Sequence, residues 1–212
     1  LHAASLLLTT GCFRAEPPAD VTIINGNEPE SLDPHIVTGV SEMRITKALF
    51  DGLIRLDPHD ASPVPALAER WEISPDGKTY TFHLRPNAVW STGEPITSAD
   101  VVWSWFRALS PATAGDYAGQ LFCIKGAEDW YNGKLPDQSL VGIHALDAQT
   151  LRVELNAPLA FFLELCSFPT LAIVPRQAIE KNGDRWLQVK PLPTSGAFTL
   201  GAWRVNDKVR LL

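Results

Sequence analysis

The stretch Lys78–Leu84 (KTYTFHL) decides the class of fold, because its residues alternate strictly between apolar and polar. In an extended chain the apolar members fall on one face and the polar members, His83 among them, on the other. Ser74–Gly77 (SPDG) has the composition of a tight turn. The pattern therefore predicts a hairpin between Trp71–Ile73 and Lys78–Leu84, with one buried face and with His83 on the exposed one.

Further strands and helices are expected on the carboxyl-terminal side of this hairpin. Leu140–Leu146 and Leu151–Leu155 flank a four-residue polar connector and predict a second hairpin. A helix opens at Thr97–Asp100, where a hydroxyl and an acidic residue suit a helix start, and its apolar circumference predicts burial on more than one side. Shorter elements are expected in four places: helices at 160–167 and 175–181, and strands at 197–200 and 208–212, around Trp203.

The amino-terminal side is expected to be a strand, a loop and a helix. Val21–Asn25 (VTIIN) is β-branched and predicts a strand that ends in a turn-rich loop over 26–34. Ser41 is expected to cap a helix, and Leu53–Leu56 to form a short strand. The three prolines of residues 57–65 predict irregular chain, and Ala66–Trp71 is expected to make one or two turns of helix.

Composition describes an ordinary folded chain of one large or two small domains. The 212 residues are 45% hydrophobic and 20% charged, which excludes extensive disorder. The formal net charge of -6 disfavours a nucleic-acid partner. Seventeen prolines and 14 glycines argue against a helical bundle. The expected fold class is mixed α/β (α+β).

The first 20 residues predict export from the cytoplasm. Leu1–Cys12 is apolar, too short to span a bilayer, and ends in small residues before a cysteine, like the end of a lipoprotein signal peptide. Cys12 is the expected site of lipid attachment, and residues 13–20 the tether. Cys123 and Cys166 are read as small buried residues rather than a disulfide. Nothing in their spacing indicates a metal site, and no metal or cofactor is expected.

No pattern typical of a nucleophile or of phosphate binding is present, so no catalytic residue is assigned. One alternative stays open. Asp33 and His35 could serve an extracytoplasmic hydrolase as a carboxylate with a nearby imidazole. Asp33–Pro34 is more typical of a turn, in which the Asp side chain caps the following backbone.

Five separated motifs, in this order, carry a resemblance to a known family. They are NGNEPESLDPH (25–35), ALFDGL (48–53), PALAERW (65–71), TYTFHLR with VWSTGEP (79–95), and TSADVVWSW (97–105). The series resembles the extracytoplasmic solute-binding proteins of the peptide and nickel class of ABC importers, most closely the oligopeptide-binding members. It spans essentially residues 21–212, and members of the family are more than twice as long.

The resemblance implies the amino-terminal part of a two-lobed periplasmic-binding-protein fold. Residues 21–40 and 170–212 would belong to the ligand-binding lobe and residues 41–169 to an inserted small α+β domain, while the second lobe would lie beyond Leu212. The residues that match the ligand-bordering positions of the family are Asn27, Glu28, Pro29, Glu30 and Tyr117.

The function implied is the capture of peptides by their backbone and their delivery to an ABC permease with its ATPase subunits. The expected protein is a monomer of the periplasm or cell surface, attached to the membrane through a lipid anchor alone. The nearest alternative keeps this fold but binds nickel chelates, haem or oligosaccharides. The hydrolase is the distant alternative.

Overall fold

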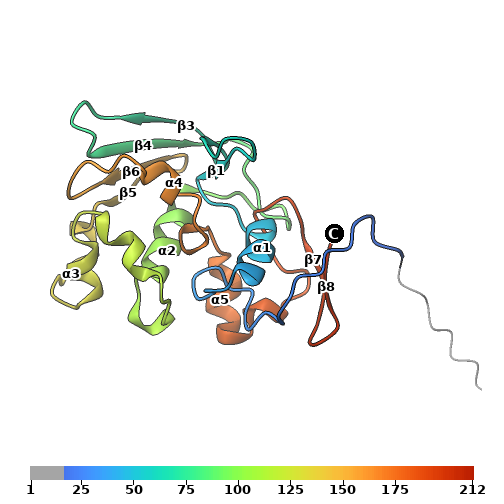
Figure 1. Cartoon of the computed structure of the whole chain (residues 1–212). Coiled ribbons are helices and arrows are strands. Elements are labelled where there is room, and N and C mark those ends of the chain that lie inside the picture. Colours follow the sequence, from blue (N-terminus) through green and yellow to red (C-terminus); the bar gives the residue numbers. More distant parts are fainter. Residues whose placement is uncertain (1–16) are drawn as a thin grey trace, which may run out of the picture.

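The KTYTFHL strand lies inside the larger sheet of the computed structural model, which describes residues 17–212 (Figure 1). It forms β4 (Thr79–Leu84), paired antiparallel with β3 (Ala68–Ile73) and with β6 (Thr150–Glu154). β5 (Ile143–Asp147) pairs with β6 and completes the order β3-β4-β6-β5. Both predicted hairpins are confirmed, as is the mixed α/β class.

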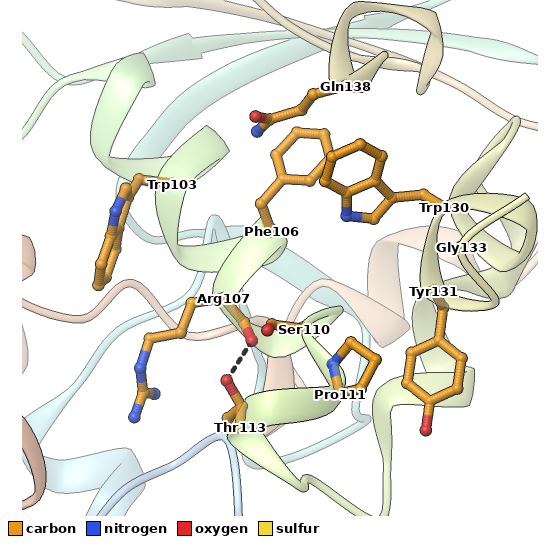
Figure 2. Close-up of a pocket in the computed structure, with 10 residues that line it drawn as sticks. All are labelled: Trp103, Phe106, Arg107, Ser110, Pro111, Thr113, Trp130, Tyr131, Gly133 and Gln138. Carbon is orange, nitrogen blue, oxygen red and sulfur yellow. Dashed lines mark hydrogen bonds between the residues drawn. The ribbon is translucent and has the colours of Figure 1, made fainter. Parts of the chain in front are cut away.

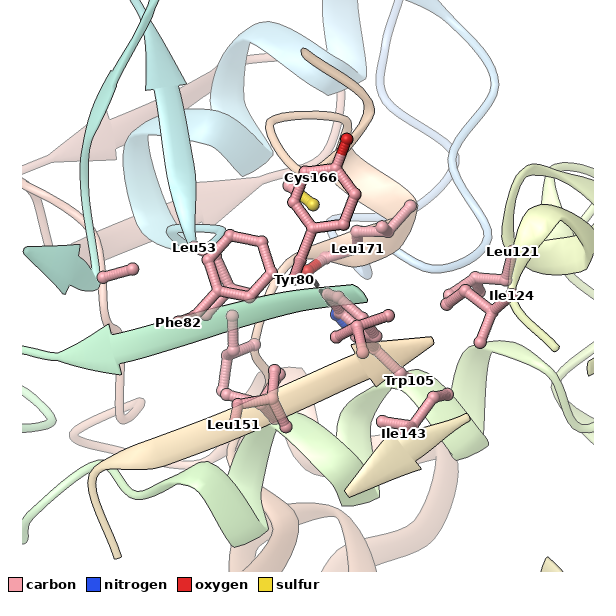
Figure 3. Packing of buried hydrophobic residues seen from close by; sticks show 14 of the residues in the cluster. Leu53, Tyr80, Phe82, Trp105, Leu121, Ile124, Ile143, Leu151, Cys166 and Leu171 are labelled. Carbon is pink, nitrogen blue, oxygen red and sulfur yellow. Dashed lines mark hydrogen bonds between the residues drawn. The ribbon is translucent and has the colours of Figure 1, made fainter. Parts of the chain in front are cut away.

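One face of this sheet packs against α2 (Ser98–Ala108), as Figure 1 shows. The Asp100 carboxylate accepts hydrogen bonds from the backbone N–H and the hydroxyl of Thr97, both at 2.8 Å, so the predicted helix start is confirmed. The alternation in β4 buries its apolar side, and Phe82 is 0% exposed. Trp105 of α2 is equally buried and lies in the same apolar cluster (Figure 3).

A second apolar cluster lies beside the first and joins the two ends of the chain. It is built by α1 (Val40–Leu49), α5 (Arg176–Asn182) and the antiparallel pair β7 (Leu200–Arg204) and β8 (Lys208–Leu211). Its buried members are Leu32, Ile45, Leu49, Phe50, Ala172, Val174, Trp186 and Leu192. The loop before α1 and the carboxyl-terminal segment therefore share one core.

Residues 171–174 form the seam between the two clusters. Leu171 and Ile173 belong to the sheet cluster, while Ala172 and Val174 belong to the second one. Backbone groups of all four are hydrogen-bonded: Trp105 Nε1 donates to Leu171 O (2.9 Å), and the N–H of Val174 donates to Ser104 Oγ (3.0 Å). Leu171 ends a 3-10 segment and the chain is extended from Ala172 on, with successive side chains in different cores.

The remaining elements are short. β1 (Ile54–Leu56) pairs with β2 (Pro63–Pro65), and α3 (Ala127–Tyr131) and α4 (Phe162–Leu165) are single-turn helices. Five 3-10 segments connect them: Pro111–Thr113, Ala118–Cys123, Gln138–Leu140, Pro169–Leu171 and Gly183–Gln188. None of the helices within residues 17–212 has the length and apolar character needed to cross a bilayer.

Two predictions of local structure on the amino-terminal side are wrong. Val21–Asn25 forms no strand, although its residues favour one, because no strand among the described residues pairs with it; Ile24 is 94% exposed. Ala66–Trp71 is not helical, since most of it forms β3, where pairing with β4 outweighs the local preference.

Smaller boundary errors have identifiable causes. α1 is capped at Gly39 instead of Ser41, because the side chain of Glu42 reaches back to the Gly39 N–H. The proline-rich stretch 57–65 ends in β2, an edge strand where prolines are tolerated. The strand predicted at 197–200 begins at Leu200 and includes Trp203. Cys123 and Cys166 are free; Cys166 is buried, as expected, whereas Cys123 is only half-buried. Cys12 lies outside the described residues.

Candidate ligand-binding site

Residues 25–31, which we call the rim segment, contain four of the five predicted ligand residues. No backbone–backbone hydrogen bond joins this segment to any other described residue. Asn27, Glu28 and Glu30 are exposed, while Pro29 is buried. The rim segment is therefore an accessible piece of non-helical chain whose carbonyl groups are not used by a sheet or a helix.

The rim segment is held by side chains at its first residue and near its end. The Asn25 amide donates to Ser41 O (3.0 Å) and accepts from Arg44 Nη1 (3.0 Å). The Glu30 N–H donates to Glu42 Oε1 (2.8 Å), while the other Glu42 oxygen accepts from the Gly39 N–H at 2.9 Å. A single buried carboxylate at the start of α1 thus caps the helix and fixes the rim.

A third attachment ties the rim to the opposite end of the chain. Glu28 Oε1 accepts a hydrogen bond from Trp203 Nε1, and Glu28 Oε2 accepts one from the Asn206 N–H, both at 3.0 Å. In Figure 1 the segment that leads to α1 passes the β7–β8 hairpin that carries these donors. The structure therefore places Glu28 against this hairpin.

Two backbone donors are missing from the middle of the rim. Pro29 has no N–H group, and the N–H of Glu30 is taken by Glu42. The carbonyl oxygens of residues 28, 29 and 30 accept no hydrogen bond from the described backbone. This part of the rim offers mainly acceptors, which suit a partner that brings N–H groups.

Tyr117 is placed beside the end of the segment that follows the rim. Its loop packs against His35 so closely that a Cβ on Gly115 would lie 2.3 Å from the His35 carbonyl oxygen. Only a glycine fits there. Tyr117 itself is half-buried, with its ring edge-on to Phe168 at a centroid distance of 5.2 Å. The structure thus brings the loop of Tyr117 to residues 33–37, and gives Tyr117 a packing partner.

Asp33 and His35 form a buried cluster with Arg107 of α2. Arg107 pairs with Asp33 at 2.5 Å and donates from Nη1 to His35 Nδ1 at 2.8 Å. His35 Nε2 donates to Ala172 O at 3.0 Å. Asp33 also accepts from the His35 backbone N–H, the turn that the Asp-Pro sequence predicts. The cluster joins the end of the rim region to α2 and to the seam.

Burial and hydrogen bonding set the charge states of this cluster. Burial raises the pKa of Asp33, but the Arg107 hydrogen bond and the nearby charges outweigh it, so the pKa falls below its ordinary value. Burial lowers the pKa of His35 to about 4. The imidazole is therefore neutral, with Nδ1 as acceptor and Nε2 as donor. Both ring nitrogens are occupied, so His35 has no lone pair available to act as a general base.

A pocket of about 540 Å³ is lined by α2 and by residues of the segment 110–138 (Figure 2). Trp103, Phe106, Trp130 and Tyr131 supply most of its aromatic lining. In Figure 2 the Arg107 guanidinium points away from Phe106 and Trp130, in keeping with its pairing to Asp33. None of the five predicted ligand residues lines this pocket.

Sequence reasoning missed three residues that shape the site: Glu42, Arg107 and Trp203. Glu42 had a local signal, since it lies three residues after the glycine that caps α1. Arg107 is the single basic residue of an otherwise apolar helix, which indicates a buried partner. Trp203 had no signal, because its partner Glu28 is 175 residues away.

The fold agrees with a match to a known family. Residues 62–212 match the family model described as bacterial extracellular solute-binding proteins, family 5 Middle. This match covers more than half of the chain. The chain therefore belongs to the bacterial extracellular solute-binding proteins of family 5.

Individual relatives match almost the whole chain. The periplasmic oligopeptide-binding protein OppA of Escherichia coli is 41% identical over 98% of this chain and 40% of its own length. The probable deoxycholate-binding periplasmic protein YgiS of the same organism is 37% identical over 99% of this chain and 41% of its own. The chain thus spans about two fifths of the length of these relatives.

The solved structures agree in fold. The structure of Haemophilus influenzae OppA in complex with RPPGFSPFR superimposes with a TM-score of 0.83 at 36% identity. That match covers 88% of this chain and 36% of the other. At 36% sequence identity, the two chains share more than their general architecture.

Proposed function

We propose that this protein captures peptides by their backbone and delivers them to an ABC importer. The observation that carries the proposal is the rim segment, in which carbonyl groups without backbone partners are held in place by three side-chain anchors. The names of the relatives support it, because several of them are oligopeptide-binding proteins.

The rim suits a ligand that is recognised by what all peptides share. Each backbone hydrogen bond contributes about 1 kcal/mol net, so several in a row are needed for useful affinity. The carbonyl groups of residues 28–30 would accept from ligand N–H groups, and side-chain selectivity would be left to roomier, wetter surroundings. Asn27, Glu28, Pro29, Glu30 and Tyr117 are the residues we assign to the ligand-bordering region.

The architecture proposed for the whole protein is a two-lobed trap. Residues 21–40 and 170–212 would form part of one lobe and residues 41–169 the inserted domain, with a second lobe closing on the ligand. The protein would work as a monomer in the periplasm or at the cell surface. Lipid attachment at Cys12 and docking to a permease with ATPase subunits complete the proposal.

The proposed mechanism involves no catalysis. The hydrolase alternative required His35 as a base, and the pairing of both its ring nitrogens argues against that role. The cargo alternatives keep the same fold. Nickel chelates, haem and oligosaccharides remain to be compared with peptides, and the name of YgiS adds deoxycholate to the comparison.

The test is direct binding by the product of the complete reading frame. Calorimetry with short peptides of mixed sequence should give micromolar or tighter dissociation constants, and acetylation or substitution of side chains should matter less than methylation of backbone nitrogens. Parallel titrations use a nickel chelate, haem, an oligosaccharide and deoxycholate. Saturable binding of one of these, with none of peptides, would refute the peptide assignment.

A further inference from the structure

We propose that Glu28 is a positioning residue, which holds the rim segment in its binding conformation by fastening it to the β7–β8 hairpin, and that Glu30 is the rim carboxylate left free to meet the ligand. This proposal rests on the proposed function, because it gives roles to two residues of the same site.

The carboxylate of Glu28 is already occupied. One oxygen accepts from the indole of Trp203 and the other from the backbone N–H of Asn206, each at 3.0 Å. A ligand that used these oxygens would have to replace two hydrogen bonds to an ionised group, which are stronger than neutral ones. The geometry therefore favours a structural use of this side chain.

The hairpin is a suitable anchor, because it is itself attached to a core. Trp203 packs against the second apolar cluster, as do Leu200, Val209 and Leu211. Asn206 has a positive φ of 59°, which belongs to the tight turn between β7 and β8. The backbone N–H that binds Glu28 is thus set by the turn and not by a flexible side chain.

Glu30 is a natural comparison on the same segment. Its side chain is exposed and makes no hydrogen bond or ion pair with any residue in the described part of the chain. Only its backbone N–H is engaged, by Glu42. The two acidic residues therefore carry equal charge two positions apart, but only one of them is tied to the fold.

The anchor matters because, apart from the burial of Pro29, little else holds the middle of the rim. Asn25 and the Glu30 N–H are fixed by α1, while Gly26 has a φ of +87° and nothing within 4 Å of its Cβ position. Without the Glu28 contacts, residues 26–28 would form a loose loop between Asn25 and the buried Pro29. Ordering that loop on binding would then reduce the affinity for every peptide.

The experiment compares Glu28→Ala, Glu28→Gln, Trp203→Phe and the matched control Glu30→Ala. Amide hydrogen exchange is measured first, without ligand, at the two hydrogen-bonded N–H groups that report on the anchor: that of Glu30, which reports on the rim, and that of Asn206, which binds Glu28 directly. We expect at least about tenfold faster exchange in Glu28→Ala and Trp203→Phe, a partial recovery in Glu28→Gln, which keeps one acceptor, and no change in Glu30→Ala. The double variant Glu28→Ala/Trp203→Phe should exchange no faster than Glu28→Ala, because both remove the same contact.

The second measurement is affinity for a neutral peptide and for a lysine-containing peptide of equal length. Glu28→Ala should weaken both by about tenfold, whereas a ligand contact would weaken the basic peptide selectively. Unchanged exchange in Glu28→Ala, or a loss confined to the basic peptide, would overturn the positioning role. If the unmodified protein binds no peptide, the proposed function fails, while the exchange result still decides whether Glu28 orders the rim.

Discussion

Replacement of Arg107 by methionine should destabilise the protein severely. The substitution keeps most of the aliphatic volume within α2 but leaves the carboxylate of Asp33, whose side chain is 5% exposed, without its charged partner. It also removes the donor to His35 Nδ1. The Asp33 carboxylate is then left largely shielded from solvent.

The size of the effect follows from this burial. Removal of one partner of a buried ion pair costs about 3–5 kcal/mol, a large share of the 5–15 kcal/mol that stabilises a typical domain. With an m value of about 3 kcal/mol/M, the urea midpoint should fall by about 1–1.7 M. Denaturation of the chain at pH 7, followed by circular dichroism, measures it.

Two further variants make the measurement specific. Arg176→Met breaks an ion pair with Glu180 in which both side chains are about half exposed. It also removes a cation–π contact with Trp103, so it should change the unfolding free energy by no more than about 1 kcal/mol. Asp33→Asn added to Arg107→Met removes the unpaired charge and should recover part of the loss. A loss in Arg107→Met no larger than that in Arg176→Met would refute the reasoning.

Two more predictions concern the same core. Burial lowers the folded-state pKa of His35 to about 4, so between pH 6.5 and 4 the unfolded chain binds the proton first and stability falls as the pH falls. His35→Gln should remove about 3 kcal/mol of this dependence in urea titrations. Gly196→Ala would place a Cβ 2.4 Å from the Ala48 carbonyl oxygen and should lower the unfolding free energy by about 1–3 kcal/mol. Gly119→Ala would make only ordinary van der Waals contacts and should leave the unfolding free energy nearly unchanged. Thermal denaturation measures both variants.

Local patterns predicted the fold best where burial and sequence period agree. The alternation in Lys78–Leu84 has one explanation, a half-buried strand, and the structure has it. Ala66–Trp71 was misjudged because its strand conformation comes from pairing with β4 and not from its own pattern. Val21–Asn25 shows the converse, since its residues favour a strand but no described strand is beside it. Strand propensity can be judged from a single segment, whereas strand formation also depends on a second segment that pairs with it.

The candidate site was harder to predict from the sequence, because its structure also depends on pairs of distant segments. The position of the rim segment followed from the resemblance, but its anchoring depends on contacts between distant residues. Glu28 meets the hairpin 175 residues later, and Asp33 meets Arg107 74 residues later. Single-sequence patterns carry no information about such pairs. The three anchors therefore became visible only in three dimensions.

The alternation along residues 171–174 has a consequence for how this protein can change in evolution. Deletion or insertion of one residue there would exchange the partners of every side chain, so that each core received residues shaped for the other. Loop lengths elsewhere can drift, but the spacing of these four positions cannot. Because both cores draw on the same short segment, we expect them to melt in a single transition, and neither could be transplanted into another protein by cutting the chain at this point.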